Sequence, residues 1–267
     1  MPKIVVCGKG GSGKSVLTVL LSRIFPDKGY QVLIIDSDES NLGLARMLGI
    51  LPPGKSLLEY LGGKKEVGRK LRNALANKEE SKIEMTMFSG DVNLDLIDPD
   101  CIVKDGNISL VQIGKILHAH EGCACPMGVI AREFLNKLSP GEKDMVIVDT
   151  EAGIEHFGRG LESGADVVLI VIDASYESVL LAEKVFTMSV EANVKCMAVI
   201  NRVDETGTSI IKNALQKNNN QIAGEISYDP QIARACLTGE PVTAEGEAGK
   251  DVSLLVDFLE NEVLITK

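Results

Sequence analysis

The sequence has no tryptophan, and aromatic residues make up only 4% of its 267 positions. Side chains that could stack the bases of a single-stranded nucleic acid are therefore scarce. Positive charge is also in deficit, because 28 Lys and Arg oppose 38 Asp and Glu and leave a formal charge of −10. A chain with this balance is not expected to hold duplex DNA electrostatically as a monomer. The composition therefore argues against a nucleic-acid partner.

Long apolar runs and cysteine-rich segments are missing too. The longest strand-like apolar run, Val167–Ile172, lies between two aspartates and is far shorter than the ~18 residues that span a bilayer. The apolar start of the chain is too short for a signal-peptide core. The C-terminal helical pattern has acidic polar residues, unlike a membrane-surface helix. Six cysteines do not make a disulfide scaffold. We expect a cytoplasmic protein with reduced thiols and no membrane partner.

The chain does contain a regular alternation of short β-branched runs and longer helical patterns. Several strand candidates are almost continuously apolar, as expected for strands covered on both faces. This order predicts an α/β fold, a mostly parallel central sheet with helices on both faces, in which residues 1–267 form one domain. The expected strands are residues 3–7, 32–36, 110–113, 145–149, 167–172, 196–200 and 222–226, and the expected helices are residues 14–25, 128–138, 176–191, 208–217 and 252–263.

Residues of about 51–108 interrupt this alternation with proline and glycine turns and a mixed-charge helical pattern. The turn Asp105-Gly106-Asn107 suggests short strands or a hairpin there. We interpret the segment as an insertion on one side of the sheet.

Residues 8–15, Gly-Lys-Gly-Gly-Ser-Gly-Lys-Ser, follow the first expected strand and precede a helical pattern. They match the phosphate-loop template G-x-x-x-x-G-K-[ST] in its required context. The glycines let backbone N–H groups turn toward phosphate oxygens, and the helix N-terminus adds partial positive charge. Lys14 is expected to bridge the β- and γ-phosphates, and Ser15 to ligate Mg²⁺. The loop therefore predicts a site for ATP or ADP.

Lys9 is a charge that the basic template does not demand. It is either a solvated surface lysine or a second cation for a phosphate, including one on a neighbouring subunit. Residues 9–15 resemble the deviant Walker A motif of the MinD/ParA-type ATPases, a superfamily that includes the nitrogenase iron protein. The resemblance implies a MinD-like P-loop NTPase that hydrolyses ATP. It also implies that Lys9 is the signature lysine, which contacts the nucleotide across a dimer interface.

Two carboxylates follow expected strands beside this loop. Asp38 comes shortly after the second strand, as either a helix N-cap or the group that positions the attacking water. Asp149 ends an apolar strand and fits a Walker B carboxylate that holds Mg²⁺ directly or through water. The resemblance implies that Asp38 faces the hydrolytic water and that Gly153 senses the γ-phosphate.

The nucleobase is expected beside Asn201, because an amide can read both donor and acceptor positions of adenine. Asn201 matches the family position that contacts adenine, and Arg202 follows it. Tyr228 stands where many members of the family have proline. The nucleotide-binding residues expected are Gly8, Gly10, Gly11, Ser12, Gly13, Lys14, Ser15, Val16, Asp149, Gly153, Asn201 and Arg202, and the catalytic residues are Lys9, Lys14 and Asp38.

Cys123 and Cys125 form the densest cluster of possible metal ligands with their neighbours. Two thiolates cannot complete a tetrahedral shell alone. A homodimer could supply four sulfurs, His118, His120 or Glu121 could complete the shell, or the thiols could form a strained redox pair. Soft thiolates favour Zn²⁺, Cu⁺, Ni²⁺ or iron–sulfur clusters. The other four cysteines are dispersed and are interpreted as small core residues.

The Cys-x-Cys element, at about 118–128, and the switch that follows Asp149 resemble those of the CooC-type ATPases. These are maturation factors for nickel-dependent carbon monoxide dehydrogenases. The resemblance implies an ATP-hydrolysing metallochaperone, a homodimer that binds Ni²⁺ or Zn²⁺ at Cys123 and Cys125, with such a dehydrogenase or a related enzyme as client. It implies no role for His118, His120 and His156, and a lone histidine such as His156 is more often structural.

Two other functions share the phosphate loop. A positioning or partition ATPase would not use the cysteine pair, and the acidic charge balance counts against it. An iron–sulfur ATPase like the nitrogenase iron protein needs a cysteine after the Walker B switch, and none lies between Asp149 and Cys196. Iron–sulfur scaffold ATPases usually carry Cys-x-x-Cys instead.

Overall fold

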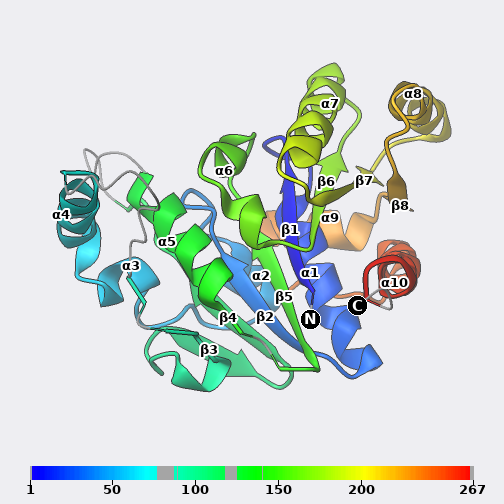
Figure 1. The fold of residues 1–267 in the computed structure, drawn as a ribbon. Helices are drawn as coiled ribbons and strands as arrows, with labels where there is room; N and C mark the ends of the chain where they lie inside the picture. The colour runs from blue at the N-terminus through cyan, green and yellow to red at the C-terminus, as the bar shows by residue number, and fades with distance from the viewer. Residues whose placement is uncertain (1, 77–86, 89, 118–124, 140, 265–267) are drawn as a thin grey trace.

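The computed structural model describes residues 2–76, 87–88, 90–117, 125–139 and 141–264. Within these ranges the strands form one eight-stranded sheet in the order β3-β4-β2-β5-β1-β6-β7-β8 (Figure 1). Neighbouring strands run parallel except for β3 and β4. The strands are β1 (Lys3–Gly8), β2 (Gln31–Asp36), β3 (Ile102–Asp105), β4 (Ile108–Gln112), β5 (Asp144–Asp149), β6 (Val167–Ile172), β7 (Lys195–Asn201) and β8 (Ile222–Ile226). The predicted fold class is confirmed.

Helices cover both faces of the sheet (Figure 1). They are α1 (Lys14–Ile24), α2 (Leu44–Leu48), α3 (Leu57–Tyr60), α4 (Gly63–Ala76), α5 (Cys125–Lys137), α6 (Glu155–Gly158), α7 (Tyr176–Glu191), α8 (Glu205–Gln216), α9 (Pro230–Thr238) and α10 (Glu247–Leu259). Short 3₁₀ turns occupy Phe25–Lys28, Leu94–Leu96 and Leu161–Gly164, and a π-helical turn, Glu260–Leu264, follows α10. No helix of the described chain is long and apolar enough to cross a membrane.

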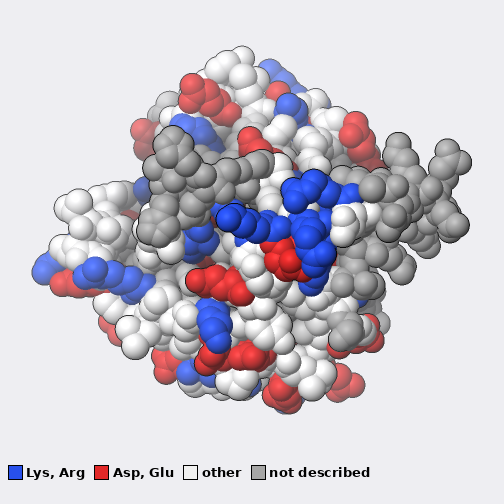
Figure 2. Space-filling model, turned by 90° about the vertical axis from the view of Figure 1, so that its left-hand side faces the viewer, with Lys and Arg blue, Asp and Glu red and all other residues white. Residues whose placement is uncertain are grey.

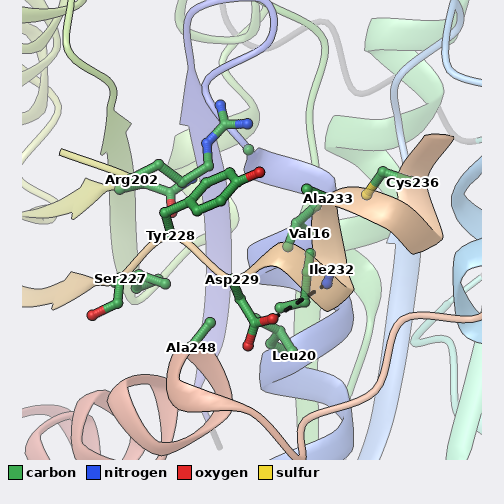
Figure 3. A pocket seen from close by; sticks show the side chains of 13 residues that line it. Val16, Leu20, Arg202, Ser227, Tyr228, Asp229, Ile232, Ala233, Cys236 and Ala248 are labelled. Atoms are coloured by element: carbon green, nitrogen blue, oxygen red, sulfur yellow. Dashed lines mark hydrogen bonds between the residues drawn. The ribbon is translucent and has the colours of Figure 1, made fainter.

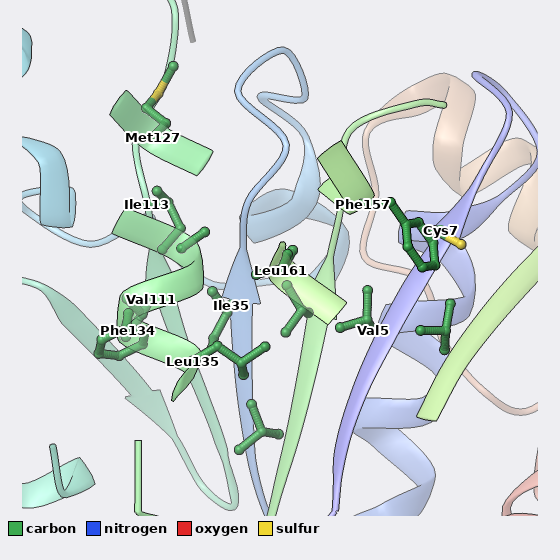
Figure 4. Close-up of a cluster of buried hydrophobic side chains, with 14 of the residues drawn as sticks. Val5, Cys7, Ile35, Val111, Ile113, Met127, Phe134, Leu135, Phe157 and Leu161 are labelled. Atoms are coloured by element: carbon green, nitrogen blue, oxygen red, sulfur yellow. The ribbon is translucent and has the colours of Figure 1, made fainter. Parts of the chain in front are cut away.

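The two faces of the sheet carry separate hydrophobic cores, because successive side chains of a strand point to opposite sides. In β1, Ile4 and Val6 pack into the core beneath α1 and α10. Val5 and Cys7 pack into the other core, which Phe134 of α5 joins (Figure 4). Both faces of β1 are buried from Ile4 onward, which explains why the strand is apolar from Ile4 to Cys7.

The helix boundaries differ from the predicted ones where capping residues extend a helix. α8 begins at Glu205 because the Asp204 carboxylate accepts a hydrogen bond from the Gly207 N–H at 2.7 Å. α9 was not predicted, although Asp229 caps it and Pro230 occupies its first turn. Residues of α9 and of the phosphate loop line the same cavity. The helix that was not predicted therefore forms part of the candidate site.

The segment of about 51–108 contributes α3, α4 and β3. β3 and β4 form the hairpin that the Asp105-Gly106-Asn107 turn suggested, and β3 lies at the edge of the sheet. α4 carries five basic residues and one acidic residue. Figure 2 shows basic side chains gathered on the face of the molecule that carries this helix. Basic side chains therefore gather locally on this face although the whole chain has a net negative charge.

Candidate functional site

The phosphate loop, residues 8–15, connects β1 to α1 at the carboxyl end of the central strands. Gly13 has a φ of 104°, and a Cβ atom there would lie 2.2 Å from Nδ2 of Asn201. Any side chain at Gly13 would therefore both strain the backbone and collide with the neighbouring strand end. α1 begins without a side-chain cap, so its first N–H groups are suited to an anion. The loop has the form that a phosphate group requires.

Lys14 is buried at the start of α1, with 6% of its surface exposed. Its Nζ donates a hydrogen bond to the backbone oxygen of Lys9 at 3.3 Å, which holds the ammonium group against the loop. A buried ammonium group needs anionic or polar partners, because burial disfavours the unpaired charge. Its position fits the expected contact with the β- and γ-phosphates.

Ser15 and Asp149 meet as the phosphate-loop and Walker B motifs predict. The Ser15 hydroxyl donates to Oδ2 of Asp149 at 2.7 Å and accepts from Nδ2 of Asn41 at 2.8 Å. The pKa of Asp149 is raised to about 7, chiefly by burial and also by the charge of Asp36, while the Ser15 hydroxyl and Lys14 lower it. A buried carboxylate beside a hydroxyl provides the oxygen donors that Mg²⁺ prefers. These two residues fit a magnesium site.

Asp38 holds the loop that follows β2. Its Oδ1 accepts hydrogen bonds from the backbone N–H and hydroxyl of Ser40 at 2.9 and 2.7 Å and from the Asn41 N–H at 3.1 Å. It does not cap a helix, because Gly43 occupies the N-cap of α2. The carboxylate therefore braces its own turn next to the phosphate loop.

Lys115 is a residue of this region that sequence reasoning missed. Its side chain is 9% exposed, and its Nζ lies 2.7 Å from the wholly buried carboxylate of Asp36. The same ammonium group donates to the backbone oxygens of Asp38 and Asn41. It therefore ties the segment after β4 to the loop after β2. The sequence did contain a signal for this contact. Lys115 follows the apolar strand β4 closely, and the neighbouring strand β2 ends in Asp36.

Lys9 is held by its own chain. Its Nζ donates to the Ser175 hydroxyl at 2.9 Å and lies 3.6 Å from carboxylate oxygens of both Asp173 and Glu177. Those residues lie at and before the start of α7, on the other side of β1 from Asp149. Lys9 thus follows β1 and contacts the segment after β6, whereas Asp149 ends β5 on the opposite side of β1.

A cavity of about 200 Å³ adjoins the phosphate loop where the nucleobase is expected (Figure 3). Asn201 and Arg202 lie at its edge, and each already binds the loop. Nδ2 of Asn201 donates to the Ser12 oxygen at 2.7 Å, and Nη2 of Arg202 donates to the Gly11 oxygen at 2.6 Å. The side chains that line the cavity include Val16, Leu20, Tyr228, Ile232 and Cys236.

This cavity has apolar walls of the kind that accept a flat ring. Val16 and Leu20 of α1 face Ile232 of α9 across it (Figure 3). The interpretation of Cys236 as a core residue is wrong, because its side chain is exposed and lines this cavity. Cys7 and Cys101 are buried, as expected.

The segment after β5 lies against the phosphate loop. Gly153, with a φ of 94°, donates its N–H to the Gly8 oxygen at 3.1 Å. Arg159 Nη1 lies 2.5 Å from Oε1 of Glu151 and 3.9 Å from Oε1 of Glu39. The pKa of Glu151 is raised to about 8, chiefly by burial and also by the neighbouring Glu39, while the charge of Arg159 lowers it. Arg159 therefore lies against carboxylates of both the loop after β2 and the segment after β5.

His156 is buried in α6, and neither ring nitrogen has a hydrogen-bond partner within the described part of the chain. The pKa of the imidazole is lowered from 6.5 to about 3, chiefly by burial and also by the charges of Lys14 and Arg159. The ring is therefore neutral at physiological pH. The buried neutral ring supports a structural role for His156, and we assign no bound ligand to it.

We expect His156 to make the fold acid-sensitive. The folded protein resists protonation of the ring, so its contribution to stability is complete above pH 6.5 and is lost as the pH falls toward 3. The loss amounts to about 2 kcal/mol between pH 7 and pH 5. Urea unfolding of the wild-type protein and His156→Gln at both pH values would measure it. A stability difference between the two proteins that is the same at pH 7 and pH 5 would contradict the prediction.

The cysteine element is described in part. Cys125 begins α5 and is exposed. Cys123, His118, His120 and Glu121 lie outside the described residues. Among the residues that are described, no group of three or more His, Cys, Asp or Glu side chains is arranged to hold a metal ion. A metal at this element would therefore need ligands from residues 118–124 or from another chain.

Comparison with known proteins identifies the family. Residues 3–242 match the model of the CobQ/CobB/MinD/ParA nucleotide binding domain. The chain belongs to this family. An ATP-binding protein of Methanocaldococcus jannaschii is 45% identical to this MinD/ParA-type protein over 251 residues, which are 94% of this chain and 97% of that protein.

Two further relatives fit the expected resemblance. The carbon monoxide dehydrogenase accessory protein CooC of Rhodospirillum rubrum is 33% identical over 198 residues, covering 74% of this chain and 73% of CooC. The septum site-determining protein MinD of Pyrococcus horikoshii, solved with Mg-ADP, has the same fold, with a TM-score of 0.69 at 19% identity over 99% of this chain and 98% of that one. The chain is therefore a P-loop ATPase of the MinD/ParA type, as predicted, and CooC is one of its homologues.

Proposed function

We propose that this ATPase is a metallochaperone that assists nickel insertion into a carbon monoxide dehydrogenase-type enzyme. The observation that carries the proposal is the Cys-x-Cys pair of the sequence, whose second cysteine begins α5, in a chain that is 33% identical to a carbon monoxide dehydrogenase accessory protein. The cysteine pair distinguishes this function from positioning and partition, which need only the nucleotide site.

ATP would lie along the phosphate loop, with adenine in the cavity between α1 and α9. Lys14 would bridge the β- and γ-phosphates. Mg²⁺ held by Ser15 and Asp149 would neutralise charge on those phosphates. Asp38 binds its own turn through Oδ1, so positioning of the attacking water would fall to its Oδ2. Gly153, bound to Gly8, would report the presence of the γ-phosphate.

Lys9 would act in a homodimer. For it to reach a phosphate of the neighbouring subunit, its contacts with Asp173, Ser175 and Glu177 must break. The phosphate would be a stronger partner than these carboxylates, which both lie 3.6 Å from Nζ, because a charge-assisted hydrogen bond to phosphate is shorter and directional. Nucleotide would in this way favour the paired state, in which each subunit completes the site of the other.

The paired state would also complete the metal site. Two copies of Cys123 and Cys125 supply four thiolates, the number that a tetrahedral or square-planar shell takes. Ni²⁺ or Zn²⁺ is the cargo in this proposal, and the client is a nickel-dependent carbon monoxide dehydrogenase or a related enzyme.

The proposal predicts about one Ni²⁺ or Zn²⁺ per dimer. Metal content, metal affinity and molecular mass would be measured on one reduced sample with ADP or ATP. A Cys123→Ser/Cys125→Ser variant is expected to lose the metal while it still binds ATP, and Lys9→Ala is expected to stay monomeric with ATP. Cys196→Ala, which removes a thiol from β7, serves as the matched control. Unchanged metal stoichiometry in the double-serine variant would overturn the proposal.

A further inference from the structure

The side chain of Arg159 joins three parts of the chain that are distant in sequence. Its guanidinium group contacts Glu151 after β5 and Glu39 after β2, at 2.5 and 3.9 Å. These carboxylates are mostly buried, with 17% and 8% of their side chains exposed. The loops that carry them also hold Asp149 and Asp38. Arg159 therefore links the segments that follow β2 and β5.

The aliphatic part of Arg159 lies on helix α5. A Cβ atom at Gly128 would lie 2.1 Å from Cδ of Arg159 and 3.1 Å from its Cγ. One turn further along α5, Nη1 of Arg132 donates to the Arg159 backbone oxygen at 3.4 Å. Gly128 and Arg132 are four residues apart and share a helix face. The first turns of α5, which begin at Cys125, thus rest on Arg159.

A second connection runs from the same loop toward the cysteine element. The Glu39 backbone oxygen accepts a hydrogen bond from the Ile116 N–H at 3.1 Å. Lys115, the preceding residue, donates to the Asp38 backbone oxygen at 2.6 Å. Lys115 and Ile116, which precede the cysteine element in the sequence, contact the loop after β2, and the first turns of α5, which follow it, contact Arg159.

We propose that Arg159 is a positioning residue that couples the nucleotide-facing loops to the start of α5, so that the bound nucleotide sets the exposure and geometry of Cys125. This rests on the proposed function, whose regulation it describes. Coupling of this kind requires an element that differs between two nucleotide states, and packed side chains transmit such a difference. Gly128 is needed because any side chain there would push Arg159 off the helix.

The test measures the alkylation rate of Cys125 in the reduced, metal-free protein by mass spectrometry, with Mg-ATP and with Mg-ADP. In the wild-type protein the two rates are expected to differ by about 5-fold or more. In Arg159→Gln, and in Gly128→Ala, which keeps the arginine, the ratio is expected to fall toward one. Arg69→Gln is the control, because Arg69 pairs with Glu66 of its own helix on the exposed face of α4.

The two variants act differently on the fold, which keeps the result interpretable. Arg159→Gln leaves two buried carboxylates without their cation, whereas Gly128→Ala meets a flexible side chain and adds a residue that favours a helix. Equal alkylation rates in the wild-type protein, or a wild-type ratio in Gly128→Ala, would overturn the inference. Because no metal is present, this outcome is independent of the metal stoichiometry on which the proposed function depends.

Discussion

The Lys14→Ala variant is expected to hydrolyse ATP about 10²–10³-fold more slowly than the wild-type protein. Lys14 is buried at the first position of α1, and its ammonium group is held at the phosphate loop by the Lys9 backbone oxygen at 3.3 Å. A cation fixed at this position stabilises the charge that develops on the transferred phosphoryl group without any rearrangement during the reaction. Release of phosphate under saturating ATP would measure the effect on kcat.

The matched control for Lys14→Ala is Lys55→Ala. Lys55 is exposed and pairs with Asp100, far from the phosphate loop in the sequence. Its removal is expected to leave hydrolysis unchanged, because exposed ion pairs contribute about 0–1 kcal/mol. A Lys14→Ala rate within a few-fold of the wild-type rate would show that another group carries the phosphate contact.

Lys115→Met is expected to lower the free energy of unfolding by about 3–5 kcal/mol. Asp36 is wholly buried, its Oδ2 lies 2.7 Å from Nζ of Lys115, and its Oδ1 has no hydrogen-bond partner within the described chain. Removal of the lysine leaves a buried carboxylate whose remaining side-chain donor is Gln112, at 3.1 Å. Denaturant unfolding at pH 7 would measure the loss.

A double variant separates the ion pair from simple packing. Lys115→Met combined with Asp36→Leu replaces both charges by apolar groups of similar size, and such replacements are often neutral or stabilising. We therefore expect the double variant to recover most of the stability that the single variant loses. A double variant as unstable as Lys115→Met alone would mean that the lysine acts through its bonds to the Asp38 and Asn41 backbone oxygens instead.

The sequence predicted the parts of the site that lie in short contiguous motifs. The phosphate loop sets Lys14 and Ser15 by spacing alone, and Asp149 follows from an apolar strand that ends in a carboxylate. The fold class followed for the same reason, since the alternation of strands and helices is a local pattern. These features need no knowledge of distant contacts.

Most contacts of Lys115 and Arg159 were harder to predict, because they join segments that are distant in the sequence. Lys115 binds a backbone oxygen 77 positions away, and a backbone acceptor carries no sequence signal. Arg159 is close in the sequence to Glu151, but its contact with Glu39 depends on β2 and β5 being neighbours in the sheet. α9 is a different case, because Asp229 and Pro230 did mark its start.

The contacts of Lys9 also affect how salt should act on subunit pairing. In the free chain the ammonium group already has two acidic neighbours, Asp173 and Glu177, each at 3.6 Å. In the proposed dimer, Lys9 would exchange its ionic contacts with Asp173 and Glu177 for contacts with a phosphate of the partner. The number of ionic contacts would therefore change little. Salt screens both sets of contacts, so the screening largely cancels. The pairing equilibrium would then follow the nucleotide much more than the ionic strength, although the chain carries a formal charge of −10.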